Sequence, residues 1–149
     1  MAGFNSRGDL HQRIYKKLQT VIPDLQSIDN HGKSVVLGYM DLNLDVLRRG
    51  PTKTIIALSH YYKHPSGDMI ADPDMVLAVY SDRAMAEALS YQDSFGYQEV
   101  YSQGGAMVDV RAKRELNQFL MQWLSNLIVQ GHRIHSPEMT VMPNGAEHE

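Results

Sequence analysis

The segment Ser59–Met75, SHYYKHPSGDMIADPDM, concentrates the side chains that most readily bind a metal ion. Metal sites are built from three or four imidazole or carboxylate groups that converge on one point. The candidate ligands here are His60, His64, Asp68, Asp72 and Asp74. The spacing of the two histidines suits one face of a helix, but residues 54–62 read as a strand, with His64 in the following turn. We therefore interpret the segment as a hairpin turn and expect no metal and no cofactor.

Two other groups of residues have types that carry chemistry. Glu87 shares a predicted strand face with Met85 and Leu89, and a carboxylate buried there would have a raised pKa and serve as a general base. The alternative is that Glu87 pairs with an arginine or faces solvent. Positive charge in the first turn of a helix opposes the helix dipole, so a basic cluster there indicates an anion or nucleic-acid contact or, alternatively, a solvated charged turn. The cluster is Arg111, Lys113 and Arg114.

The elements that position these residues follow from periodicity and from turn signals. Apolar residues at helical spacing predict a helix from Asp9, as its N-cap, to Pro23, and a second helix between Asp109 and Gly131. Strands are predicted at 41–47, 53–62, 74–82, 83–90 and 95–102, although 83–90 also contains good helix formers. This order predicts an α+β fold: an antiparallel meander of about five strands with both helices on one face. We expect one domain over residues 1–135 and a mobile tail over 136–149.

Composition limits the classes of function. The formal net charge is −3, which disfavours binding to nucleic acid without excluding it. The chain has no cysteine, so disulfides and cysteine nucleophiles are absent. It has no uninterrupted apolar segment of membrane-spanning length and none of the common hydrolase or nucleotide-binding motifs. We expect a soluble, cytoplasmic protein that does not contact a membrane.

Two blocks carry a resemblance: DPDMVLAVYSDRAMAEALSYQ at 72–92 and RELNQFLMQWLSNLIVQGH at 114–132. They resemble small bacterial proteins described only as domains of unknown function, whose chromosomal branch has a Met-Ala-Glu strand and an Asn-x-Phe-Leu-x-x-Trp-Leu helix. The chain is closer to a sister branch on plasmids, phages and integrative elements, with SHYY-, DPDM-, LSYQ- and YQEVY-like blocks. It departs from the chromosomal branch at 97–101, where that branch has an Arg-Tyr-x-Tyr-Pro-like segment. The resemblance implies bacterial origin and a mobile element, but no catalytic residues.

We therefore expect a non-enzymatic accessory protein that binds a protein partner through the uncovered sheet face. Aromatic residues favour such interfaces because they bury a large area at low entropic cost. The candidate binding residues are Tyr61, Tyr62, Tyr91, Gln92, Tyr97 and Tyr101. Pairing of edge strands into a homodimer remains open, as do a small metal- or carboxylate-dependent enzyme using the His60–Asp74 segment and a nucleic-acid-binding protein.

Overall fold

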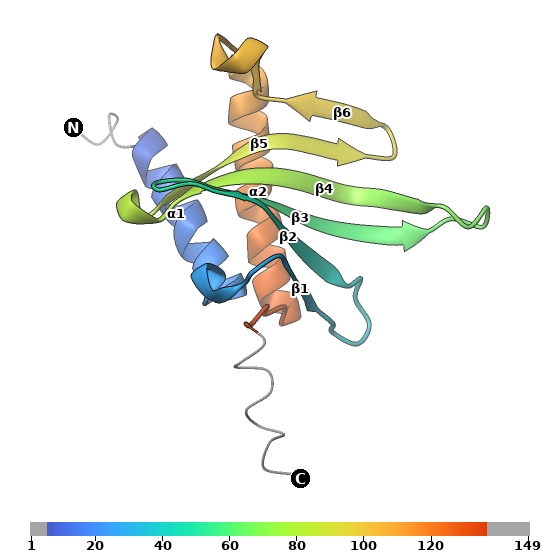
Figure 1. Ribbon diagram of the computed structural model, residues 1–149. Helices are drawn as coiled ribbons and strands as arrows, with labels where there is room; N and C mark the ends of the chain where they lie inside the picture. Colours follow the sequence, from blue (N-terminus) through green and yellow to red (C-terminus); the bar gives the residue numbers. More distant parts are fainter. Residues whose placement is uncertain (1–5, 137–149) are drawn as a thin grey trace, which may run out of the picture.

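The computed structural model describes residues 6–136, which form two helices, a six-stranded antiparallel sheet and a separate two-stranded sheet (Figure 1). The predicted α+β meander is confirmed, with strands adjacent in chain order from β1 to β6. Within these residues, no helix is long and apolar enough to cross a membrane. The elements are α1 (Ser6–Val21), η2 (Leu25–Ser27), β1 (His31–Ser34), β2 (Leu42–Arg49), β3 (Thr54–Lys63), β4 (Met69–Tyr80), η3 (Ser81–Arg83), β5 (Met85–Asp93), β6 (Gly96–Glu99), β7 (Tyr101–Ser102), η4 (Gln103–Gly105), β8 (Met107–Val108) and α2 (Val110–Gln130).

The core lies between the sheet and the two helices, which both cover the same face (Figure 1). Alternate residues of the strands point into it because side chains of a strand alternate between the two faces. Both helices contact β5, where the inward residues are the small Ala86 and Ala88. Each large aliphatic side chain buried here contributes about 1.5–3 kcal/mol. The fully buried large residues include Ile14, Leu42, Leu44, Ile56, Leu58, Met75, Leu77, Leu120, Leu124 and Leu127.

The second helix begins and ends where the sequence predicts. The side chain of Asp109 accepts a hydrogen bond from the Ala112 amide at 2.9 Å, and Gly131 ends the helix with φ of 95°. That left-handed conformation favours glycine. The predicted start of the first helix at Asp9 is wrong, because α1 already begins at Ser6.

The strands differ from the predictions in three places. Residues 85–90 of the strand predicted at 83–90 belong to β5, while Arg83 and Ala84 belong to the turn η3 and its end. β4 begins at Met69, within the segment expected to be turn and link. The strand predicted at 95–102 is broken into β6 and β7, which belong to different sheets. The break is at Val100. Its side chain is buried, and its amide still donates a hydrogen bond to the Leu89 carbonyl of β5. The short strands β1 and β8 have too few residues to show periodicity and were not predicted.

The residues that follow α2 return to β1 and α1. The Ile134 amide donates to the Val21 carbonyl at 2.7 Å, and the Ile134 side chain is fully buried. A Cβ atom at Gly32 would lie 2.5 Å from Cγ2 of Ile134, so β1 passes this segment at a distance that only glycine allows. Most of the tail predicted at 136–149 lies outside the described residues, while Ser136 is described and buried.

We predict that Gly32→Ala lowers the free energy of unfolding by about 1–3 kcal/mol, because the added methyl group overpacks the contact with Ile134. Gly96→Ala is the matched control, since a Cβ atom there has no neighbour within 4 Å. Urea denaturation of the two variants measures the difference. Equal stability of both variants would show that β1 and the segment after α2 are not in close contact.

Candidate functional site

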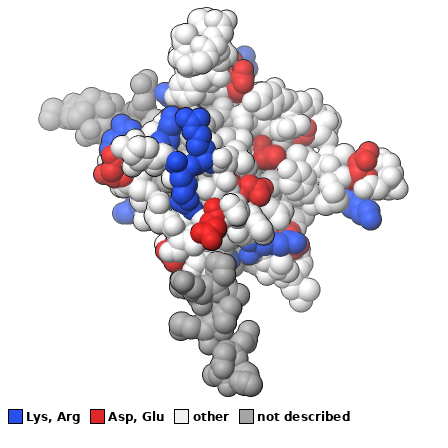
Figure 2. Space-filling view, in the orientation of Figure 1, with Lys and Arg blue, Asp and Glu red and all other residues white. Residues whose placement is uncertain are grey.

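The two helices leave the other face of the sheet uncovered, and we call this the open face. The strand register places every second residue on it, among them Asp45, Ser59, Asp74, Gln92 and Tyr97. Figure 2 shows acidic side chains scattered over this side of the molecule, with a group of Lys and Arg at one end. The open face is therefore polar and charged where the opposite face is apolar.

A hollow of about 620 Å³ lies in the open face beside β1, β2 and the hairpin formed by β3 and β4. Lys33 and Asp41 form an ion pair across it, with Nζ 3.4 Å from Oδ2. In the described part of the chain, Asp45 on the hollow's lining has no ion-pair partner. The side chains that line the hollow include His31, Lys33, Asp41, Asn43, Asp45, Tyr61 and Met69.

Beside the hollow, three side chains form a cluster with unsatisfied hydrogen-bonding atoms. The Tyr61 hydroxyl donates to Oδ2 of Asp74 at 2.8 Å, and Ser59 is the residue directly opposite Asp74 in the strand register. Oγ of Ser59 and Oδ1 of Asp74 are buried and have no hydrogen-bond partner among the described residues. Burial, then the hydrogen bond and charge of Asp74, raise the pKa of Tyr61, while the neighbouring Ser59 hydroxyl opposes this shift without reversing it. The phenol therefore stays protonated as a donor.

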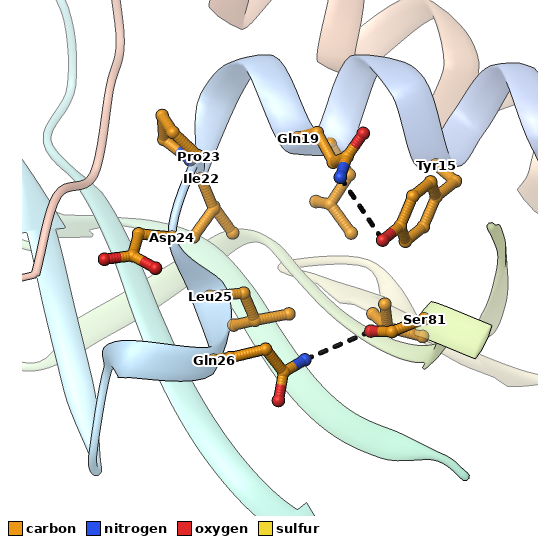
Figure 3. A pocket seen from close by; sticks show the side chains of 10 residues that line it. Tyr15, Gln19, Ile22, Pro23, Asp24, Leu25, Gln26 and Ser81 are labelled. Atoms are coloured by element: carbon orange, nitrogen blue, oxygen red, sulfur yellow. Dashed lines mark hydrogen bonds between the residues drawn. The ribbon is translucent and has the colours of Figure 1, made fainter.

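A second, smaller cavity of about 130 Å³ lies where α1 ends (Figure 3). Its polar side chains are already paired: Nε2 of Gln19 donates to the Tyr15 hydroxyl at 3.3 Å, and Nε2 of Gln26 donates to Oγ of Ser81 at 3.1 Å. A binding site needs polar groups that are available to orient its ligand. The hollow in the open face, whose neighbouring polar atoms lack partners, is therefore the stronger candidate site.

The residues considered as metal ligands are not brought together. Nδ1 of His60 donates to the Asp41 carbonyl at 2.8 Å, and its ring packs edge-on against Trp123 on the helix side of the sheet. His64 hydrogen bonds with Ser66 in the turn before β4. Asp68 lies in the same turn, Asp72 is exposed on β4, and Asp74 lies on the open face. Within residues 6–136, no three His, Asp or Glu side chains are grouped so that they could hold a metal ion.

The six candidate binding residues do not share one surface: three lie on the open face, two on the helix side and one outside the large sheet. The register places Tyr61, Gln92 and Tyr97 on the open face. It places Tyr62 and Tyr91 on the helix side, where the Tyr91 ring meets Phe119 edge-on at 5.3 Å. Burial and a hydrogen bond to Asp93 raise the pKa of Tyr91 to about 12. Tyr101 lies in β7, beyond the edge of the large sheet.

The basic cluster of α2 is also divided. Arg111 pairs with Glu115 on the helix surface, with Nε 3.0 Å from Oε2. Nζ of Lys113 donates instead to the Tyr101 hydroxyl at 3.0 Å, so this lysine holds β7 against the helix. Arg114 is exposed and lines a cavity with Lys113 near the start of α2. The three side chains therefore do not form one anion site.

Glu87 accepts hydrogen bonds from two tyrosines. The hydroxyl groups of Tyr80 and Tyr101 donate to its two carboxylate oxygens at 2.8 and 2.7 Å, in place of the arginine that we considered. The Lys113 bond to Tyr101 extends this network into α2. Burial, followed by the hydrogen bond and charge of Glu87, raises the pKa of Tyr80. The network joins β4, β5, β7 and α2, which is a structural role for the carboxylate.

His132 is buried rather than exposed at the end of α2. Its Nδ1 hydrogen bonds with Oγ of Ser34 at 2.8 Å, and its Nε2 has no hydrogen-bond partner among the described residues. The ring centroid lies 5.9 Å from that of His60. Burial, and then the neighbouring His60, lowers the pKa of His132, while the Met40 backbone and the charge of Asp41 oppose the shift without reversing it.

The open-face residues Asn43, Asp45 and Ser59 were not predicted as site residues. Asn43 and Asp45 lie in the strand predicted at 41–47, where polar residues alternate with apolar ones. Alternation shows that they face water but not which residues of other strands stand beside them. The signal that could have found them is the number of polar residues at outward positions of neighbouring predicted strands.

We predict that Glu87→Ala lowers the free energy of unfolding by about 1.5–3 kcal/mol, because two hydrogen bonds to a charged acceptor are lost. Glu115→Ala, which removes only an exposed ion pair, costs less than about 1 kcal/mol. Urea denaturation compares the variants, and ultraviolet titration follows Tyr80, whose pKa falls when the charge of Glu87 is removed. Equal destabilisation with an unchanged tyrosine titration would contradict the network.

We predict that stability decreases as pH falls through the ordinary histidine range of about 6.5, because the unfolded chain then binds a proton that buried His132 resists. Above this range the contribution disappears, since both states are neutral. His132→Asn reduces the acid-dependent loss, whereas His135→Asn, at an exposed site, leaves it unchanged. Denaturation at neutral pH and at about pH 5 tests both variants. An unchanged acid loss in His132→Asn would assign the effect to another group.

Comparison with known proteins places the chain in a family of domains of unknown function. A family model described as a domain of unknown function, DUF6908, matches residues 11–133. No curated protein and no solved structure matches the chain significantly. Because the family model spans most of the chain, from α1 to the residues after α2, the protein belongs to the DUF6908 family of domains of unknown function.

Proposed function

We propose that the protein is a non-enzymatic accessory protein that binds a protein partner through its open face. The observation that carries the proposal is the hollow of about 620 Å³ beside the unsatisfied atoms of Ser59 and Asp74. Buried polar atoms without partners cost free energy, and a partner that supplies the missing hydrogen bonds recovers it. The open face therefore has a physical reason to be occupied.

Large exposed side chains on the open face support a protein as the occupant. Tyr61 and Met69 on the hollow's lining are 36% and 60% exposed, and Tyr97 on β6, at the other edge of the open face, is 58% exposed. Aromatic residues and methionine are enriched at the centres of protein interfaces. Asp45 adds a charge without an ion-pair partner in the described part of the chain, which favours a partner with a basic surface.

The resemblance of the blocks at 72–92 and 114–132 supports a bacterial protein encoded on a mobile element, and the absence of cysteine suits the cytoplasm. In that setting the partner is a protein of the host or of the same element. A second copy of the chain is the competing occupant, because a sheet edge such as β6 can continue into another sheet.

The test uses a photo-crosslinking amino acid placed at Tyr97 on the open face or at Val129 on α2, both of which are exposed. In bacteria that produce the protein, we predict a discrete crosslinked partner from position 97 and none from position 129. Asp45→Lys reduces the yield by about tenfold or more, because it reverses a charge on the hollow. Asp82→Lys is the matched control, an equal charge change at an exposed site in η3.

Mass spectrometry identifies the crosslinked species. A partner captured equally from both positions, or unaffected by Asp45→Lys, would contradict binding through the open face. A crosslink from position 97 to another copy of the chain would replace the protein partner with a homodimer.

A further inference from the structure

The cluster of Ser59, Tyr61 and Asp74 beside the hollow lacks a hydrogen-bond donor for one carboxylate oxygen. A carboxylate can only accept hydrogen bonds, so the unpartnered Oδ1 of Asp74 requires a donor. Ser59 is 1% exposed, and its hydroxyl lies close enough to that of Tyr61 to lower the pKa of Tyr61, but its Oγ has no partner within hydrogen-bonding distance among the described residues. Ser59 lies between Asn43 and Asp74 in the strand register, so all three share the open face. A ligand that completes this cluster must bring several N–H or O–H groups.

The charge of the site indicates that the ligand is a cation. Asp41 is paired with Lys33, but neither Asp45 nor Asp74 has an ion-pair partner in the described part of the chain. Asp45 lies on β2 and Asp74 on β4, the two strands that flank β3, and Tyr61 of β3 donates to Asp74. A desolvated carboxylate is stabilised strongly by a cation that also donates hydrogen bonds.

Tyr61 controls access to these atoms. Its register partner on β4 is Ala71, yet its hydroxyl reaches Asp74, which stands opposite Ser59. The side chain therefore leans back along β3 over Ser59 and Asp74, which explains why their unpartnered atoms are buried although the open face bears no helix. A ligand that reaches them must turn Tyr61 aside. The displaced ring can then lie against the bound cation.

From these observations we infer that the hollow binds the guanidinium group of an arginine side chain of the partner, an inference that rests on the proposed function. A guanidinium carries five N–H donors in a plane, more than the unpartnered Oδ1 of Asp74 and the carboxylate of Asp45 on the hollow's lining require. Its flat face also stacks on an aromatic ring. A lysine ammonium brings the charge but only three donors and no plane. Arginine is therefore the better fit to acceptors arranged around Tyr61.

The test titrates the ¹⁵N-labelled protein with N-acetylarginine methylamide and follows its amide signals by NMR. The expected result is a saturable shift at Ser59, Tyr61 and Asp74. The citrulline counterpart, which has the same shape without the charge, and the lysine counterpart bind at least about tenfold more weakly. If the citrulline counterpart bound equally well, the site would not select a cation. If the lysine counterpart bound equally well, the site would not select a guanidinium group.

Variants locate the binding. Asp74→Asn and Asp45→Asn each weaken it by about tenfold or more, whereas Asp82→Asn leaves it unchanged. Tyr61→Phe strengthens it, because the ring remains while the hydroxyl no longer occupies Oδ2 of Asp74. The exposed Asp45 provides a second test if Asp74→Asn does not fold. Weaker binding by Tyr61→Phe, or no site-specific shift in the wild type, would overturn the inference. Crosslinking from position 97 would then still test the proposed function separately.

Discussion

The fold depends on the burial of one face of the sheet by both helices. Large aliphatic residues fill the inward positions of β2, β3 and β4, while β5 offers Ala86 and Ala88 where the helices cross it. Small side chains at these positions allow both helices to approach the sheet closely. Because both helices lie on this face, the outward residues of the same strands remain available for polar groups. The apolar core and the polar open face are two consequences of the same arrangement.

Several residues of the two resembling blocks have structural roles. Asn117 is 1% exposed: its Oδ1 accepts from the Ala88 amide at 2.8 Å, and its Nδ2 donates to the Lys113 carbonyl. This bond satisfies an amide of β5 beside a β-bulge in its pairing with β4. Trp123 packs against Phe119 on one side and His60 on the other. Together with the tyrosines bound to Glu87, these contacts fasten α2 to the sheet.

The structural residues and the residues of the hollow differ in how clearly the sequence marks them. The residues with strong patterns, such as Asn117 and Trp123, lie inside the molecule and hold it together. The residues of the hollow, such as Lys33 and Asp45, belong to short or simply alternating strands. Which polar residues stand together on the open face is set by the pairing of neighbouring strands rather than by a local motif.

The sequence predicted the elements with strong periodicity, and it failed at the start of α1 and where pairing between strands decided the outcome. α2 followed from its apolar stripe, Asp109 and Gly131, and the α+β order followed from the strand meander. The extension of β4 to Met69 and the break at Val100 depend on hydrogen bonds to β3 and β5, which no local pattern reveals. The inward turn of His132 depends on Ser34, which is 98 positions away in the chain. Tyr61 was predicted as a binding residue, but its position beside Ser59, Asp74 and Asp45 required the register.

The central claim is that the open face is occupied when the protein acts. Hydroxyl-radical footprinting inside bacteria that produce the protein, compared with the purified protein, measures this directly at exposed side chains. The account predicts protection in the cell at Tyr61, Met69 and Tyr97, with Val129 on α2 equally reactive in both samples. Equal reactivity of the open-face residues in the cell and in the purified protein, or protection confined to Val129, would contradict it.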